Sequence, residues 1–101
     1  MAFEGAIKID GIDNIAVCLE DVKAGASVEV RLGQETWQVT ANQDVPFGFK
    51  IALTDISKGE QIHKYGESIG IASAHIKLGD MVHVHNLEGS KGRGDLEGLV
   101  Q

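Results

Sequence analysis

Short runs of apolar residues, many of them β-branched and most of them bounded by Gly or Asp, form the main pattern along this chain. Apolar and polar positions alternate within several of these runs, as expected for strands that bury one face. No stretch keeps apolar residues at the i, i+3, i+4, i+7 spacing of an amphipathic helix. The candidate strands are residues 6–9, 14–19, 28–32, 36–40, 50–53, 61–65, 68–72 and 81–87.

This pattern predicts an all-β fold with short strands, Gly turns and at most one or two short helices. The run over 14–19 is apolar almost throughout, so we expect it to be buried on both faces. Gly33 and Gln34 separate two alternating segments and predict a two-residue hairpin loop. The last part of the chain, residues 89–101, is rich in Gly and has no apolar periodicity, which predicts a flexible tail.

One local pattern occurs three times, at residues 21–28, 55–62 and 75–82. Each copy has a β-branched residue, two further residues, a glycine, two polar or flexible residues, and a β-branched residue that opens the next strand. The glycine supplies a positive φ, which a tight turn needs and which strains other residues. The pattern therefore predicts a repeated corner between strands, and its unequal spacing argues against a solenoid.

Composition narrows the class of protein. The chain has 101 residues, enough for one domain, and a formal net charge of −6. This charge argues against nucleic-acid binding, which needs a basic surface, and no apolar run approaches the length of about 20 residues needed to cross a membrane. The N-terminus has no signal-peptide pattern, and the single Cys18 excludes an internal disulfide. We therefore expect a cytoplasmic protein in which Cys18 is a buried small hydrophobe.

The most informative candidate site is the segment His83-Val84-His85-Asn86. On an extended strand, residues i and i+2 point to the same face, so we expect His83 and His85 to lie side by side. Such a pair can chelate a divalent metal, with a third ligand from His63, His75, a carboxylate or another chain. It can equally hold a polyhydroxy acid, and His-x-His alone is as typical of two exposed histidines without a task.

Two basic residues are further candidates for binding an anion. Lys50 opens an apolar strand, where it can bind an anionic group or extend along the surface. Arg93 lies between two glycines, and a flexible loop of this kind can carry a guanidinium to a carboxylate or be a disordered tail. The motifs of serine hydrolases, phosphate-binding loops and Cys-rich metal sites are missing from the sequence. We therefore expect the chain not to form a complete active site on its own.

Four short motifs follow one another in the order Pro-Phe-Gly-Phe-Lys (46–50), Lys-Tyr-Gly (64–66), Ile-Gly (69–70) and His-Val-His-Asn (83–86). In this order they resemble the small subunit or N-terminal SAF domain of the altronate/galactarate dehydratase family, whose members are also called UxaA-type hydrolases. The resemblance extends over nearly the whole chain. It implies an SAF-type β-clip domain over residues 1–88, followed by the Gly-rich tail over 89–101.

The resemblance implies a hydro-lyase subunit that is inactive alone. Such a subunit helps to eliminate water from a sugar acid of the altronate or galactarate type, giving a 2-keto-3-deoxy acid, and a large subunit completes the active site. A related branch, sulfolactate sulfo-lyase, eliminates sulfite. The alternatives are a sulfolactate sulfo-lyase small subunit, a non-catalytic SAF-type module that binds a ligand or partner, and a structural homo-oligomer. One departure is Phe49, which stands where family members often have a histidine.

The resemblance also implies a divalent metal, Fe²⁺ or Mn²⁺, held mainly by the large partner. On this basis His83 and His85 are predicted to be catalytic residues and to share a metal with the partner chain. Lys50, Asn86 and Arg93 are predicted to bind the substrate, with fixing of the turn geometry as the alternative role for Asn86. We expect the catalytic base itself to lie on the large partner.

Overall fold

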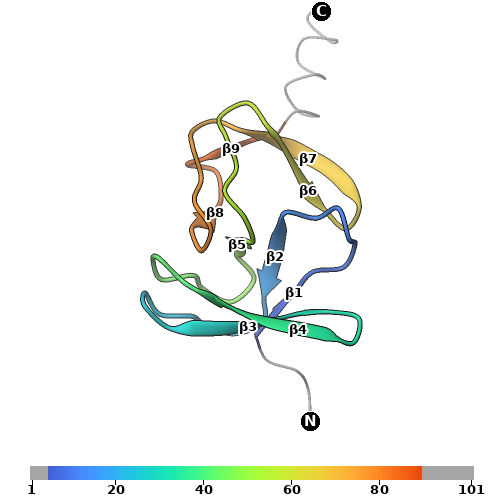
Figure 1. Cartoon of the computed structure of the whole chain (residues 1–101). Helices are drawn as coiled ribbons and strands as arrows, with labels where there is room; N and C mark the ends of the chain where they lie inside the picture. The colour runs from blue at the N-terminus through green and yellow to red at the C-terminus, as the bar shows by residue number, and fades with distance from the viewer. Residues whose placement is uncertain (1–4, 90–101) are drawn as a thin grey trace, which may run out of the picture.

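The computed structural model of the chain describes residues 5–89 (Figure 1). Within this range the backbone forms strands, turns and bends but no helix, which confirms the predicted all-β class. Accordingly, the described residues contain no helix that could cross a membrane. The strands are β1 (Ala6–Ile7), β2 (Ile15–Cys18), β3 (Ser27–Leu32), β4 (Glu35–Thr40), β5 (Lys50–Ala52), β6 (Gln61–Lys64), β7 (Glu67–Ala72), β8 (Met81–Val82) and β9 (Leu87–Glu88).

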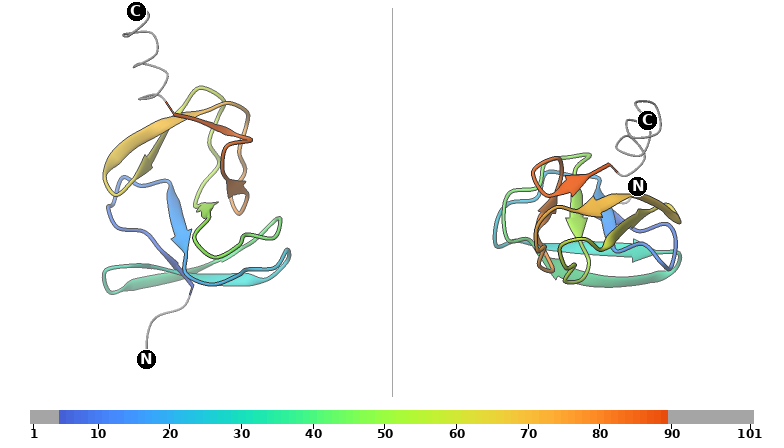
Figure 2. Two further views of the ribbon diagram at one scale, coloured as in Figure 1. Left: turned by 180° about the vertical axis from the view of Figure 1, so that it is seen from behind. Right: turned by 90° about the horizontal axis from the view of Figure 1, so that it is seen from above.

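These strands form two sheets. The larger sheet has the order β4-β3-β1-β2-β5-β8, and the smaller has the order β6-β7-β9. Neighbouring strands are antiparallel except for β1 and β3, which are parallel. The β3–β4 ribbon covers one end of the domain and the smaller sheet covers the other, with β2 and β5 between them (Figures 1 and 2). The arrangement is consistent with a small SAF-type β-clip fold.

Two hydrophobic clusters fill the domain, and β2 and β5 supply residues to both. Ala16 and Ile51 belong to the cluster formed with β3 and β4, whereas Ile15 and Ala52 belong to the cluster formed with β6 and β7. Because successive residues of a strand point to opposite faces, a strand between two cores has no face left for polar side chains. This position explains why the sequence over 14–19 is apolar almost throughout.

Hairpin loops join two pairs of neighbouring strands. Leu32 lies opposite Glu35, which leaves Gly33 and Gln34 as the two-residue loop between β3 and β4 and confirms that prediction. Between β6 and β7, Lys64 lies opposite Glu67, so that loop also has two residues.

The loop between β6 and β7 is held by a carboxylate from a distant part of the chain. Tyr65 and Gly66 both have positive φ, at 57° and 80°, as in a type I′ turn. Their N–H groups donate to the Asp13 carboxylate over 2.9 and 2.8 Å, and the N–H groups of Ile9 and Asp10 donate to the same side chain. Asp13 therefore joins the loop after β1 to the hairpin of the smaller sheet.

A corner of one shape occurs four times, at residues 21–26, 44–49, 55–60 and 75–80. Each is a β-turn closed by a backbone hydrogen bond of 2.9 or 3.0 Å, with a glycine whose φ is 86° or 92°. These are the features of a type II turn, which favours glycine at its third position. The sequence predicted three of these corners. The copy at 44–49 was missed because Phe49 follows its glycine, where the other copies have a small or polar residue.

The four corners associate in two pairs. An isolated antiparallel bridge joins Val22 to Val45, and a second joins Ile56 to Ile76. The corner at 21–26 therefore faces the corner at 44–49, and the corner at 55–60 faces the corner at 75–80.

The single strand predicted over 81–87 is wrong. It divides into β8 and β9, and the four residues between them form a bend and a turn. The physical reason is that β8 pairs with β5 in the larger sheet, whereas β9 pairs with β7 in the smaller sheet. The chain has to turn in order to pass from one sheet to the other, and the alternation of apolar residues does not reveal this change of partner.

Candidate functional site

The predicted histidine pair lies on the turn that joins the two sheets. The Asn86 N–H donates to the His83 carbonyl over 3.0 Å, which closes a β-turn with Val84 and His85 at its tip. The side chain of Asn86 is buried and fixes the turn from within. Its Oδ1 accepts a hydrogen bond from the His83 N–H, and its Nδ2 donates to the Met81 carbonyl, both over 2.9 Å. These bonds give Asn86 a structural role in the turn.

Because they lie on a turn, His83 and His85 do not project from one face of a strand, and that prediction is wrong. His83 continues the register of β5 and β8, in which Lys50 lies opposite Val82, and so it faces Phe49. The rings of His83 and Phe49 are 4.5 Å apart at 45°. His85, two residues further along, instead lines a pocket.

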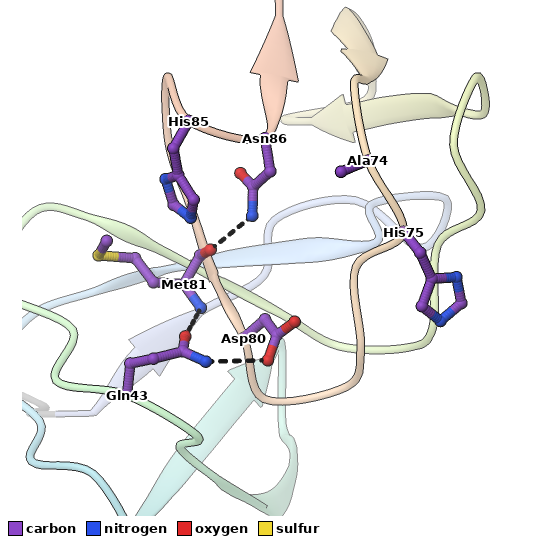
Figure 3. Close-up of a pocket in the computed structure, with 7 residues that line it drawn as sticks. All are labelled: Gln43, Ala74, His75, Asp80, Met81, His85 and Asn86. Atoms are coloured by element: carbon purple, nitrogen blue, oxygen red, sulfur yellow. Dashed lines mark hydrogen bonds between the residues drawn. The ribbon is translucent and has the colours of Figure 1, made fainter.

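This surface pocket has a volume of about 310 Å³ (Figure 3). His85 and Asn86 line it from the turn between β8 and β9, and His75 lines it from the start of the corner at 75–80. In Figure 3, His75 and His85 stand on opposite sides, and Asp80 lies between them with Gln43 beside it. The pocket therefore collects polar groups from three separate segments of the chain.

The Asp80 carboxylate is fixed and stays charged at neutral pH. It accepts hydrogen bonds from the Lys77 N–H, the Asn42 Nδ2 and the Gln43 Nε2, over 2.9, 2.8 and 3.2 Å. Burial raises the pKa of Asp80, but these hydrogen bonds together lower it below the ordinary value for aspartate. The pocket thus combines a carboxylate, which can accept hydrogen bonds from hydroxyl groups, with two imidazoles, which can donate or accept them.

Lys50 lies on the face of β5 opposite to the side on which Phe49 meets His83. It pairs with Val17 of β2 and Val82 of β8, next to Phe49 but pointing the opposite way, and it does not line the pocket. Burial lowers the pKa of the Lys50 ammonium, and the charge of Lys64 lowers it further. Within residues 5–89 no carboxylate forms an ion pair with Lys50. A half-buried ammonium of this kind has the capacity to bind an anion.

The structure thus divides the predicted site. His85 and Asn86 meet at the pocket, His83 contacts Phe49 at the other end of the same turn, and Lys50 lies apart from them. Arg93 falls outside the described residues, as does all of the predicted tail except Gly89.

Sequence reasoning named His75 only as one possible third metal ligand, and it missed Asp80 as a residue of the pocket. One signal was present in the repeated corner. Two of the three copies found in the sequence begin with Asp, at positions 21 and 55, whereas the third begins with His75. The role of Asp80 had no local signal, because its hydrogen-bond partners Asn42 and Gln43 are far away in the sequence.

A complete metal site does not fit the described part of the chain. Among residues 5–89, no group of three His, Cys, Asp or Glu side chains is arranged to hold a metal ion. His83 and His85 face different surroundings, and the Asp80 oxygens already accept three hydrogen bonds. No step that runs through a metal follows from these residues.

Comparison with known proteins gives a family match over the whole described range. Residues 4–90 match the family described as the altronate/galactarate dehydratase SAF domain. The chain is 49% identical over 80 residues to the altronate dehydratase of Escherichia coli (strain K12) and 39% identical over 80 residues to that of Bacillus subtilis (strain 168). Each match covers 79% of this chain but only 15% of the relative, so the chain spans a small part of these enzymes.

A third relative is closer to this chain in length. The chain is 34% identical over 74 residues to the (2R)-sulfolactate sulfo-lyase subunit alpha of Chromohalobacter salexigens, a match that covers 71% of this chain and 79% of the relative. The name of that relative identifies it as one subunit of an enzyme.

Proposed function

Because this chain belongs to the altronate/galactarate dehydratase SAF domain family, we propose that it is the small subunit or N-terminal domain of a sugar-acid dehydratase. It acts in the elimination of water from a sugar acid to give a 2-keto-3-deoxy acid, together with a large dehydratase part that completes the active site. The observation that carries the proposal is the 49% identity to an altronate dehydratase over 80 residues. The large part is required because the relative is far longer than the matched region.

The chemistry assigns different tasks to the two parts. A base on the large part removes the proton next to the substrate carboxylate. The hydroxyl on the neighbouring carbon receives a proton and leaves as water, and the resulting enol becomes the 2-keto acid. In our proposal His85 donates that proton and His83 holds the turn against Phe49. Asp80 accepts one hydrogen bond from another substrate hydroxyl, in addition to the three that it already accepts within the chain. The support for these roles is the position of His85 and Asp80 on the pocket wall.

The other predicted participants stay part of the proposal. Asn86 and Arg93 are assigned to the substrate, Asn86 because it lines the pocket besides fixing the turn. Lys50, which lies outside the pocket, is assigned to an anionic group of the substrate because of its half-buried ammonium and its lack of an acidic partner among residues 5–89. A divalent metal, Fe²⁺ or Mn²⁺, is assigned mainly to the large part, since residues 5–89 lack a complete ligand set. A cytoplasmic location is proposed because the family consists of metabolic enzymes.

A second candidate function is that of a sulfolactate sulfo-lyase small subunit. It is favoured by the lengths of the relatives, because the match to this chain covers 79% of the sulfo-lyase subunit but only 15% of the altronate dehydratase. Both reactions remove a group from the carbon next to the one that loses its proton, so the same pocket can serve either. The identity of the leaving group, water or sulfite, distinguishes them.

The test uses the complete enzyme, in which this chain is joined to or co-expressed with its large dehydratase part. A panel of sugar acids and sulfolactate is assayed with Fe²⁺ or Mn²⁺, and both 2-keto acid formation and sulfite release are followed. We expect His85→Ala to lower kcat by at least about 100-fold, as is typical for loss of a general acid. We expect His83→Ala to lower it by about tenfold, because a displaced catalytic group loses orientation.

His63→Ala is the matched control, since His63 lies in β6 and does not line the pocket. Size-exclusion chromatography checks that every variant still assembles with the large part. Full activity of the His83→Ala/His85→Ala double variant in an intact complex would contradict the proposed roles and leave the chain a structural or regulatory subunit.

A further inference from the structure

Three of the four corners begin with Asp, and the fourth begins with His75. In the first pair, the Asp21 Oδ1 accepts a hydrogen bond from the Phe47 N–H over 2.8 Å, and the Asp44 Oδ1 accepts one from the Ala24 N–H over 2.9 Å. Each carboxylate therefore satisfies a backbone donor at the tip of the corner opposite. The exchange is reciprocal, as expected when two copies of one shape face each other.

The second pair makes only half of this exchange. The Asp55 Oδ1 accepts a hydrogen bond from the Leu78 N–H over 2.8 Å, in the same way as in the first pair. The reciprocal bond would join the Lys58 N–H to the side chain at position 75, which is His75. Within residues 5–89, the exposed His75 side chain makes no hydrogen bond or ion pair. His75 is thus the one opening residue of the four that does not stabilise its corner pair.

The same residue stands at the pocket. His75 lines the pocket on the side opposite His85, whereas Asp55, the opening residue of the paired corner, does not line it (Figure 3). An aspartate at position 75 would satisfy the Lys58 N–H, but it would also add a second carboxylate to a pocket that already holds Asp80. The imidazole makes no such stabilising bond, and its ring lies at the rim of the pocket, directed outward in Figure 3, where it can turn toward a bound acid. Departures from a local structural rule of this kind are typical of functional sites.

We propose that His75 contacts the substrate and sets its specificity by binding a carboxylate or hydroxyl oxygen at the end of the acid remote from the reacting carbons. This inference rests on the proposed dehydratase function and adds a residue to its substrate site. Two carboxylates at the wall would repel an anionic polyhydroxy acid, whereas an imidazole N–H can donate to it. His75 takes no part in bond breaking, so it affects substrate binding more than the chemical step.

The test replaces His75 by the residue type of the other three corners. In the complete enzyme, we expect His75→Asp and His75→Asn each to raise KM at least about fivefold with kcat changed less than about twofold. In the 101-residue chain, we expect His75→Asn to raise the Tm by roughly 3 °C, because its Oδ1 can accept the Lys58 N–H without adding charge. A gain in stability together with weaker substrate binding is not expected of a residue whose role is structural.

Asp55→His is the matched control. It removes the equivalent bond from the partner corner at a residue that does not line the pocket, so we expect a lower Tm and an unchanged KM. An unchanged KM in both His75 variants overturns the inference, and so does a lower Tm for His75→Asn. If the wild-type enzyme acts on neither sugar acids nor sulfolactate, the proposed function and this inference both fail. If the wild-type enzyme is active and the His75 variants keep its KM, this inference alone fails.

Discussion

At the scale of single residues, the Asp13 carboxylate joins two segments that lie far apart in the sequence. It is only 4% exposed and accepts hydrogen bonds from the N–H groups of Ile9, Asp10, Tyr65 and Gly66. Burial raises the pKa of Asp13, but these backbone bonds, of which that from Gly66 has the largest effect, lower it below the ordinary value of 3.8. The ionised carboxylate therefore stabilises the folded state.

We expect Asp13→Asn to lower the free energy of unfolding at neutral pH by on the order of 3 kcal/mol, because an amide NH₂ would face N–H donors and leave them unpaired. The folded pKa of Asp13 lies below its unfolded pKa, so the stabilisation is present above the unfolded value and is lost as the pH falls through the folded value. The difference between wild type and variant should therefore narrow at a pH below 3.8. Urea unfolding at neutral and acidic pH measures both.

Asp10→Asn is the control for this prediction, since the Asp10 carboxylate is exposed and, within residues 5–89, accepts one hydrogen bond, from the Ile12 N–H. We expect it to cost less than about 1 kcal/mol. An Asp13→Asn cost that is the same at neutral and acidic pH would show that charge is not the cause.

At the scale of elements, the four corners share a backbone but not their surroundings. Gly59 and Gly79 occupy equivalent turn positions and both have a φ of 92°. A Cβ added at Gly79 would lie 2.2 Å from the Thr40 carbonyl oxygen, whereas a Cβ at Gly59 would meet nothing within 4 Å. The Gly79 carbonyl also accepts the Asn42 N–H over 2.9 Å, which ties this corner to the segment beneath the pocket. The corner at 75–80 is therefore packed against β4, while the corner at 55–60 has an open glycine.

These two glycines allow backbone strain to be separated from steric overlap. We expect Gly59→Ala to destabilise the domain by about 1–2 kcal/mol, the cost of a left-handed conformation for a residue with a Cβ. Gly79→Ala should cost this amount and about 2 kcal/mol more, because the Thr40 carbonyl has to move. Equal losses of stability in thermal or urea unfolding would contradict the close packing of the Gly79 corner.

At the scale of the whole molecule, β2 lies between the two cores, and its last residue is Cys18. The Cys18 side chain is fully buried. Burial, and after it the charge of Glu20, raises the pKa of the thiol to about 11. A reagent can therefore reach a thiolate at this position only after the larger sheet has opened.

We expect Cys18 to react with a thiol reagent near pH 8 at least about 1,000-fold more slowly in the folded chain than in the urea-unfolded chain, because reaction depends on the small open fraction. The rate of labelling should rise with urea in step with global unfolding. A Cys18→Ala/Ser57→Cys variant, with its thiol on an exposed corner, should react rapidly without urea. Rapid labelling of folded wild type would mean that β2 opens independently of the rest.

The sequence by itself determined the all-β class, most strand positions, the Gly33-Gln34 hairpin and three of the four corners, since each depends on neighbouring residues. The motif order from 46–50 to His-Val-His-Asn also identified the family. Tertiary structure decided which strands pair, because partners are chosen by contacts between distant segments. That choice divides 81–87 between two sheets, turns His83 toward Phe49 and His85 toward the pocket, and brings His75 and Asp80 beside it.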